Sequence, residues 1–348
     1  MYGCVSNAEE NGVEAFIRNP EVVTLALLSC LLTFLPVFVP AGGLMLSILA
    51  PFPLIVLGLK YPWSCVLGVL AVETVVLLAV EGPATFFVLT YYAVVPLLMA
   101  AAIRRGMTMS QTIVWSVCVP TVLSLFILGM YSLMQQQSPS ALLTQYIEQA
   151  LQGGLEPAEP PASAPELVPE SELPLRAEPA PAEGGLDPQD VRSIAQVLPR
   201  LVLALLPALL LVNYLLTNVV NYGVVYWYCK RGRPPLHIHT EALASWRVPD
   251  FTVWVFLASG VLLLLPLGIL RYVGLNVFVV TLALYLLQGV AIAAFWGLRL
   301  PLPPGARLLL ALLVLLFAGP LFLVLCTAAG LFDLWVDFRR QRHHPLVS

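Results

Sequence analysis

Nine long apolar segments restrict what this chain can fold into. They lack the regularly spaced polar residues that would give each one a face toward water, so a soluble fold cannot accommodate them all. A helix of about 20 apolar residues matches the ~30 Å hydrocarbon core of a bilayer. The sequence therefore predicts an all-α, polytopic membrane helix bundle with about eight to nine transmembrane helices. The apolar segments are residues 22–39, 42–59, 62–80, 83–103, 110–134, 197–229, 251–270, 276–296 and 306–332.

Three of these segments leave the number of crossings open. Pro51 and Pro53 interrupt the second segment, which is either a kinked span or a re-entrant element whose freed carbonyls must be covered by protein. The sixth segment is too long for one perpendicular crossing, so it must tilt or project from the membrane. Gly319 and Pro320 break the ninth segment. The second and ninth segments therefore need a structure to decide whether they cross.

A polar region divides the apolar segments into two groups. Residues 154–192 hold 9 of the 20 acidic residues and 9 of the 30 prolines, a composition that predicts a disordered spacer. Just before this spacer, apolar residues at helical spacing predict an amphipathic surface helix. The predicted organisation is an N-terminal segment (1–21), membrane helices 1–5 (22–134), the surface helix (135–153), the acidic linker (154–192), membrane helices 6–9 (193–332) and a charged tail (333–348).

Composition and motifs exclude several classes of function. Only 11% of the residues are charged and 59% are hydrophobic, against roughly 25% charged in an average soluble domain. Arginines occur singly or in small groups, which argues against nucleic-acid binding. The cysteines show no paired spacing, and His237 with His239 lacks a third fixed metal ligand. We therefore predict no catalytic residues, no metal, no cofactor and no enzymatic activity.

Lysine and arginine positions predict the orientation of the first six segments. If the N-terminus is cytoplasmic and all nine segments cross, the loops holding Lys60, Arg104 and Lys230 are cytoplasmic, in agreement with the positive-inside rule. The rule then fails at the tail, because Arg339 and the basic residues after it would lie on the opposite side. Either one of the last three segments does not cross, or the tail is an exception to the rule.

Glu73 is the one acidic residue near the centre of an apolar segment. An ionised carboxylate at such a depth costs roughly 2.5–3.5 kcal/mol on insertion scales, so it must be neutral, paired or in contact with water. One interpretation is a proton or cation relay or a contact to substrate. The other is a protonated side chain that hydrogen-bonds to a neighbouring helix. The sequence does not choose between them.

Two stripes of polar residues follow helical spacing inside apolar segments. Asn213, Thr217 and Asn221 are four residues apart, and Gln288 ends a second stripe that is followed by Gly289. Polar side chains and small residues commonly join membrane helices, so helix–helix contact is the more common role of such stripes. Solute binding is the alternative. On that alternative, the predicted substrate-binding residues are Glu73, Asn213, Thr217, Asn221 and Gln288.

The last apolar segment continues into charged residues at a helical exit. If the helix continues, Asp333 and Asp337 share a face and Arg339 lies roughly 120° from Asp337. These residues, together with Trp335, predict a docking surface for a protein partner. The competing interpretation is a helix end held at the membrane interface by Trp335 and Arg339.

Several segments resemble known families. WRVPD at 246–250, Asn276, Gln288-Gly289 and GLFDLWVDFR at 330–339 together resemble the YybS-like family of bacterial polytopic membrane proteins, whose function is unknown. The likeness covers most of the chain except the acidic linker. Residues 50–62 (APFPLIVLGLKYP) are similar to the start of the S components of energy-coupling-factor transporters for vitamins and metals. That similarity implies a six-helix core with both ends in the cytoplasm.

Two functional hypotheses follow for a protein of the bacterial inner membrane. In the first, it contacts the lipid bilayer and binds or transports a small-molecule solute, as the similarity to S components implies. In the second, it is a membrane scaffold or assembly factor with a membrane-protein partner and no small-molecule chemistry. The two hypotheses differ in whether Glu73 and the polar stripes serve a ligand or only join helices.

Overall fold

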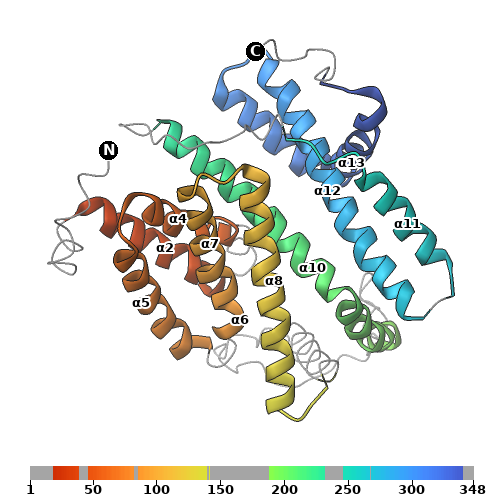
Figure 1. Cartoon of the computed structure of the whole chain (residues 1–348), viewed down its shortest axis with the longest axis horizontal. Helices are drawn as coiled ribbons and strands as arrows, with labels where there is room; N and C mark the ends of the chain where they lie inside the picture. Colours follow the sequence, from red (N-terminus) through yellow and green to blue (C-terminus); the bar gives the residue numbers. More distant parts are fainter. Residues whose placement is uncertain are drawn as a thin grey trace, which may run out of the picture. The chain divides into compact units, whose positions relative to one another are not determined.

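The computed structural model describes residues 19–38, 46–81, 85–138, 141, 188–231, 246–266 and 268–339 (Figure 1). Among these residues every regular element is helical and no strand occurs. The predicted all-α class is therefore confirmed. The chain forms two compact units, one of Met1–Ile127 with Pro207–Ser348 and the other of Leu128–Leu206. Each unit is described by itself.

The front helices of the first unit pack around a short helix, α4. This helix contacts both α2 and α7, and its residues Leu54 to Leu57 are almost completely buried. α5, α8, α10 and α12 contribute further side chains to the same core. The described helical elements up to residue 231 are α2 (Pro20–Phe38), α4 (Pro51–Lys60), α5 (Trp63–Glu81), α6 (Thr85–Leu89), the π-helical turn η2 (Thr90–Val94), α7 (Val95–Arg104), α8 (Met109–Met134) and α10 (Pro188–Arg231). Of these, α8 and α10 each extend into the second unit.

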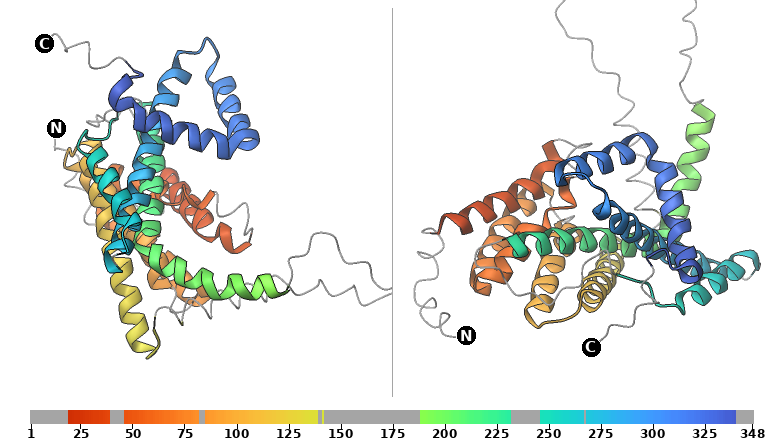
Figure 2. Two further views of the ribbon diagram at one scale, coloured as in Figure 1. Left: turned by 90° about the vertical axis from the view of Figure 1, so that its right-hand side faces the viewer. Right: turned by 90° about the horizontal axis from the view of Figure 1, so that it is seen from above.

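Three helices follow in the last third of the chain: α11 (Thr252–Leu264), α12 (Ile269–Arg299) and α13 (Pro304–Val336). α12 packs against both of the others. α13 bends sharply at Ala318 (φ −125°, ψ 22°), as Figure 2 shows. Pro320 explains the bend, because it lacks an N–H and its ring clashes with the carbonyl four residues earlier.

Each of the nine predicted apolar segments contains a helix, but their lengths differ. Within the described residues, five helical segments are long and apolar enough to cross a membrane: Trp63–Val80, Met109–Met134, Leu201–Arg231, Ile269–Arg299 and Phe317–Val336. The helices in the other four segments are shorter. The count of eight to nine crossings is therefore not confirmed, although the structure has the apolar helices of a membrane protein.

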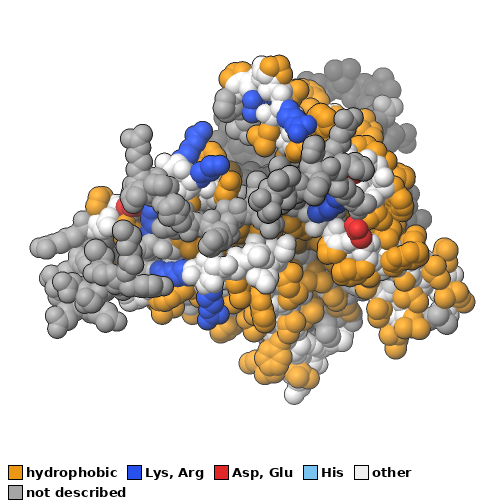
Figure 3. Space-filling model, turned by 45° about the horizontal axis from the view of Figure 1, so that its top comes forward, with side chains coloured by type: hydrophobic (Ala, Val, Ile, Leu, Met, Phe, Trp, Pro, Cys, Tyr) orange, Lys and Arg blue, Asp and Glu red, His pale blue; other side chains and the backbone are white. Residues whose placement is uncertain are grey.

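The surface has the apolar character that contact with lipid requires. Large hydrophobic side chains such as Leu67, Val72 and Val75 of α5 are more than half exposed. Figure 3 shows wide areas of apolar side chains, with Lys and Arg side chains in only a few places on that face. A protein surrounded by water rarely exposes so large an apolar surface.

α4 is too short to cross the membrane. Its ten residues span about 15 Å at 1.5 Å per residue, half the thickness of the hydrocarbon core. Pro51 and Pro53 lack N–H groups, and the N–H of Phe52 bonds to the carbonyl of Leu49. The carbonyl of Ile48 therefore loses its helical donors, and it accepts a hydrogen bond from Asn221 Nδ2 at 2.7 Å instead. This arrangement fits the re-entrant alternative.

The end of α13 lies beside the segment that precedes α11. Arg339 donates to the carbonyl of Trp246 at 2.8 Å, and Arg247 donates to the carbonyl of Asp333 at 3.0 Å. The tail and the loop before α11 are thus neighbours. If all nine segments crossed, these two parts would lie on opposite sides of the membrane. Of the two alternatives for the basic tail, the structure favours a non-crossing segment among the last three.

This arrangement predicts the side on which the C-terminus lies. A topology reporter fused after residue 348 should report the same side as the same reporter inserted between residues 232 and 245. A fluorescent protein and a periplasmic phosphatase form a suitable reporter pair, because each is active on one side only. Opposite results at the two positions would contradict the contacts between Arg339 and Trp246.

Several predictions lie outside the described residues. They concern the surface helix beyond residue 141, the linker up to residue 187, the loop with His237 and His239, and the tail after Arg339.

In the second unit, α8 ends at Met134 and Ser132 Oγ donates to the carbonyl of Gln137 at 2.5 Å. α10 begins at Pro188, within the segment predicted as linker.

Candidate functional site

The buried side of α10 carries four polar residues at the centre of the first unit. Tyr214, Thr217, Asn218 and Asn221 are almost completely buried, whereas Asn213 is exposed. Each four-residue step along a helix turns about 40° beyond one full circle. Asn213 and Asn221 are therefore about 80° apart, and only the later part of the predicted stripe faces the interior.

The π-helical turn η2 and helix α8 supply hydrogen-bonding partners of this face. The hydroxyls of Thr90, Ser124 and Tyr214 form a closed triangle with oxygen–oxygen distances of 2.9, 2.7 and 2.7 Å. Tyr91 bonds to Thr217 at 2.9 Å. Pro96 lies two residues after η2 and cannot donate to a carbonyl of the preceding turn, which explains a locally widened helix. π-helical turns are frequent at functional sites.

We expect Tyr214→Phe to destabilise the protein by about 1–2 kcal/mol, because Thr90 and Ser124 each lose a buried hydrogen-bond partner. Tyr272→Phe is the control, since that side chain is 57% exposed. Chemical unfolding of both variants in the same detergent measures the difference. Equal stabilities would mean that the hydroxyl triangle contributes nothing.

The amide groups of Asn218 and Asn221 are held in one orientation. Asn218 Nδ2 donates to the carbonyls of Ser116 (3.2 Å) and Tyr214 (2.7 Å). Asn221 Nδ2 donates to the carbonyls of Ile48 and Thr217 (2.8 Å). Rotating either amide by 180° would place oxygen against carbonyl oxygen, so the assignment is secure. Both Oδ1 atoms are buried and have no hydrogen-bond partner among the residues that the structure describes.

Glu73 lies in the contact between α5 and α2. Its side chain is 1% exposed, and its closest polar neighbours are the side chains of Ser29 and Cys30. Neither carboxyl oxygen has a partner at ordinary hydrogen-bonding geometry, and the Ser29 and Thr33 hydroxyls are also buried without partners. Within the described residues these four polar atoms have no partner at ordinary geometry; Ser29 is the hydroxyl that interacts with Glu73, and Thr33 lies one turn further along α2.

Charged residues join the ends of α2, α4 and α10. Lys60 lies 2.5 Å from Glu21 and donates to Tyr228 at 3.1 Å, and Tyr61 donates to Glu21 at 3.0 Å. Burial raises the pKa of Tyr61, and its hydrogen bond to Glu21 raises it further. Burial lowers the pKa of Lys60, but its hydrogen bonds to Glu21 and Tyr228 raise it more, so the net shift is upward. Arg104 also donates to the carbonyl of Tyr61, so Lys60 and Arg104 lie at the same end of the bundle.

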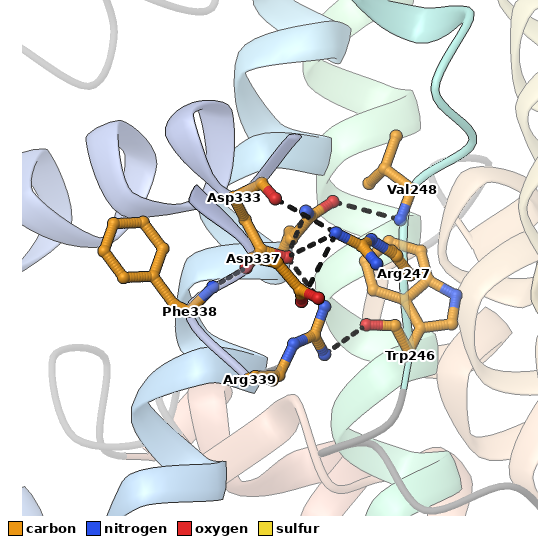
Figure 4. Close-up of polar contacts among 8 residues, drawn as sticks. Trp246, Arg247, Val248, Asp333, Asp337, Phe338 and Arg339 are labelled. Carbon is orange, nitrogen blue, oxygen red and sulfur yellow. Dashed lines mark hydrogen bonds and ion pairs between the residues drawn. The ribbon is translucent and has the colours of Figure 1, made fainter. Parts of the chain in front are cut away.

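A second polar cluster lies where the segment before α11 meets α12 and the end of α13 (Figure 4). Asp333 is fully buried and accepts hydrogen bonds from Arg339 (3.0 Å) and Gln288 (2.9 Å) on one carboxylate oxygen and from the N–H of Phe338 (2.9 Å) on the other. Arg247 lies 3.6 Å from Asp333 and 3.8 Å from Asp337. Two aspartates and two arginines leave this Asp333 cluster without net charge.

The helix end differs from the continuous helix assumed in the sequence analysis. α13 ends at Val336, and Asp337 adopts a left-handed conformation (φ 46°, ψ 63°). The chain therefore turns back, and Arg339 reaches Asp333 rather than pointing about 120° away from Asp337. Asp333, Asp337 and Arg339 are buried, while Trp335 is exposed. Partner docking stays a prediction, and Trp335 is the one of the four predicted residues that presents its side chain at the surface.

Gln288 belongs to the Asp333 cluster and not to the polar face of α10. Its Oε1 accepts from the N–H of Val248 at 3.0 Å, and its Nε2 donates to Asp333. Both ends of the amide are thus used to join helices. Of the predicted substrate-binding residues, Thr217 and Asn221 share the buried face of α10, Glu73 lies at the contact between α5 and α2, and Asn213 and Gln288 are elsewhere.

The sequence analysis did not identify the hydroxyl residues near Glu73 and Tyr214. Ser29, Thr33, Thr90 and Ser124 are single hydroxyl residues in apolar segments, and such residues usually bond to their own helix backbone. Ser29 and Thr33 are four residues apart on α2, which is a detectable spacing. Pro96 in the fourth segment could also have indicated a disturbed helix.

One comparison with known proteins gives a result. A family model described as "Predicted membrane protein (DUF2232)" matches residues 27–156 and 182–334. No curated protein and no solved structure matches the chain.

Proposed function

The chain belongs to the DUF2232 family of predicted membrane proteins, and we propose that it binds and transports a small solute across the bacterial inner membrane. The family description assigns no activity, so the proposal depends on the residues of this chain. The similarity of residues 50–62 to transporter S components supports the same class of function.

The observation that carries the proposal is the pair of unpartnered amide oxygens of Asn218 and Asn221. A buried acceptor without a donor costs about 1–3 kcal/mol, and a purely structural amide would be satisfied at both ends, as Gln288 is. The two oxygens accept and cannot donate. A solute bound here therefore carries donors, such as ammonium, amide N–H or hydroxyl groups.

The surroundings of Asn221 support a solute site. Its Nδ2 bonds to the backbone just before α4. α4 ends at Lys60, so the start of this helix lies about 15 Å from Lys60 along the helix axis. Transporters commonly place substrate sites at helices interrupted within the membrane. Because Pro51 and Pro53 lack N–H groups, the start of α4 offers few donors to an anion. The interruption therefore favours a cationic or donor-bearing solute over a carboxylate.

A thermal-stability screen of the purified full-length protein tests the proposal. The panel contains small amines, amides and polyols, with matching carboxylates for comparison. We expect one donor-bearing class to raise the unfolding temperature of the wild type, and Asn218→Leu or Asn221→Leu to remove that increase. Asn213→Leu is the matched control, because it changes an exposed asparagine on the same helix. Stabilisation by carboxylates alone, or an increase that survives both substitutions, would contradict the proposal.

A further inference from the structure

Hydroxyl groups at the contact between α2 and α5 behave differently from most others in the helices. The hydroxyls of Thr74, Ser116 and Thr121 each donate to the carbonyl four residues earlier, at 2.7 Å. This is the usual way to satisfy such a group inside a membrane helix. The Ser29 and Thr33 hydroxyls do not, although both are buried. Their oxygens remain available to another ligand.

The Glu73 carboxylate needs a positive charge. It is buried, and no ion pair joins it to the described lysines and arginines. An unpaired carboxylate in an apolar interior is strongly unfavourable. A proton would neutralise the charge, but the resulting O–H can donate to only one acceptor. The second carboxyl oxygen would then accept from the Ser29 hydroxyl, so a proton is the competing occupant that the experiment must separate from a cation.

A metal cation would balance the charge and take the free lone pairs of these groups, because carboxylate and hydroxyl oxygens can coordinate it together. We propose that Glu73, Ser29 and Thr33 form a binding site for a small alkali cation, for which Na⁺ is the probe. Ser29 contributes from beside the carboxyl, and Thr33 lies one turn further along the same face of α2.

The charge and ligand types select the class of ion. One carboxylate balances one positive charge, so a divalent ion would leave a buried net charge. The oxygen ligands suit hard cations rather than soft ones. Cys30 is the one thiol beside Glu73, and the described residues contain no group of three His, Cys, Asp or Glu side chains that could hold a transition metal.

The proposed cation site is independent of the proposed solute site, since none of its residues belongs to the polar face of α10.

The test is the unfolding temperature of the purified full-length protein, measured while NaCl replaces choline chloride at constant ionic strength and pH 7.5. We expect NaCl to stabilise the wild type and to have no such effect on Glu73→Gln. Ser29→Ala and Thr33→Val should raise the half-maximal Na⁺ concentration roughly tenfold or more, as expected for the loss of one ligand to a charged group. Thr121→Val should leave that concentration unchanged, because its hydroxyl bonds to its own helix.

Three results would overturn the inference. The first is equal stability of the wild type in NaCl and choline chloride at pH 6, 7.5 and 9. The second is a stability that depends on Glu73 and pH but not on Na⁺, which would assign the carboxyl to a proton. The third is a Na⁺ effect that survives Glu73→Gln. If that variant does not fold, the Ser29→Ala and Thr33→Val titrations decide, and the outcome of the solute screen has no bearing on them.

Discussion

Asp333→Ala is expected to destabilise the packing of α11, α12 and α13 by about 3–5 kcal/mol, the usual cost of removing one partner from a buried ion pair. Arg339 is almost completely buried beside Asp333, so the substitution leaves a guanidinium without its carboxylate. Gln288 and the N–H of Phe338 lose their acceptor in the same step. The effect should therefore exceed that of any exposed ion pair, such as Lys60 with Glu21.

Chemical unfolding in detergent, combined with hydrogen exchange of α12 and α13, measures this change. Arg271→Ala is a suitable control, because it removes an exposed charge from α12 of the same region. A double-mutant cycle with Arg339→Met separates the pair from its surroundings. If the charge left on Arg339 causes the loss, Asp333→Ala combined with Arg339→Met should be more stable than Asp333→Ala alone. A loss below about 1 kcal/mol for Asp333→Ala would show that the cluster is open to water.

The second large effect is expected for Gly289→Ala, at the crossing of α12 and α13. A Cβ atom at Gly289 would lie 1.7 Å from the carbonyl oxygen of Cys326, and one at Gly330 would lie 1.9 Å from that of Tyr285. Both obstacles are backbone atoms, which a side-chain rotation cannot remove. The helices must separate, so we expect a loss at or above the ~1–3 kcal/mol typical of overpacking. Gly330→Ala should behave alike.

Gly297→Ala is the matched control, because it lies on the same helix and no atom lies within 4 Å of its added Cβ. Alanine forms helices better than glycine by up to about 1 kcal/mol, so this variant should be unchanged or slightly more stable. The unfolding midpoints of the three variants in one detergent provide the comparison. Equal midpoints for Gly289→Ala and Gly297→Ala would contradict the close crossing.

The close approach at Gly289 was predictable, because a small residue after a polar stripe is a known pattern of membrane helix contacts. The bend of α13 at Gly319-Pro320 and the interruption at Pro51 and Pro53 were predictable too, since proline acts on the backbone of its own segment. The length of the interrupted helix was not predictable from the sequence. α4 has only ten residues, and the hydrogen bond that makes this tolerable comes from Asn221, 173 residues away from Ile48 in sequence.

The positions of the last described residues, 337–339, could not be predicted from helical geometry. Helical geometry placed Arg339 away from Asp337, because it assumed that the helix continues. Asp337 instead takes a left-handed conformation, and Arg339 then reaches Asp333 and the carbonyl of Trp246. No local pattern reveals that stop, since neither glycine nor proline marks it. Its stabilising contacts come from the segment before α11 and from α12.

The sequence by itself determined the class of the protein. Apolar length, scarce charge and proline position act within each segment, so they predict membrane helices and their breaks without knowledge of neighbours. Only the tertiary structure decided which polar residues share a site. That depends on the rotation of each helix about its axis and on its depth against the others, and both are set by contacts between residues far apart in the chain. Hence Thr217 and Asn221 face the interior while Asn213 of the same stripe does not.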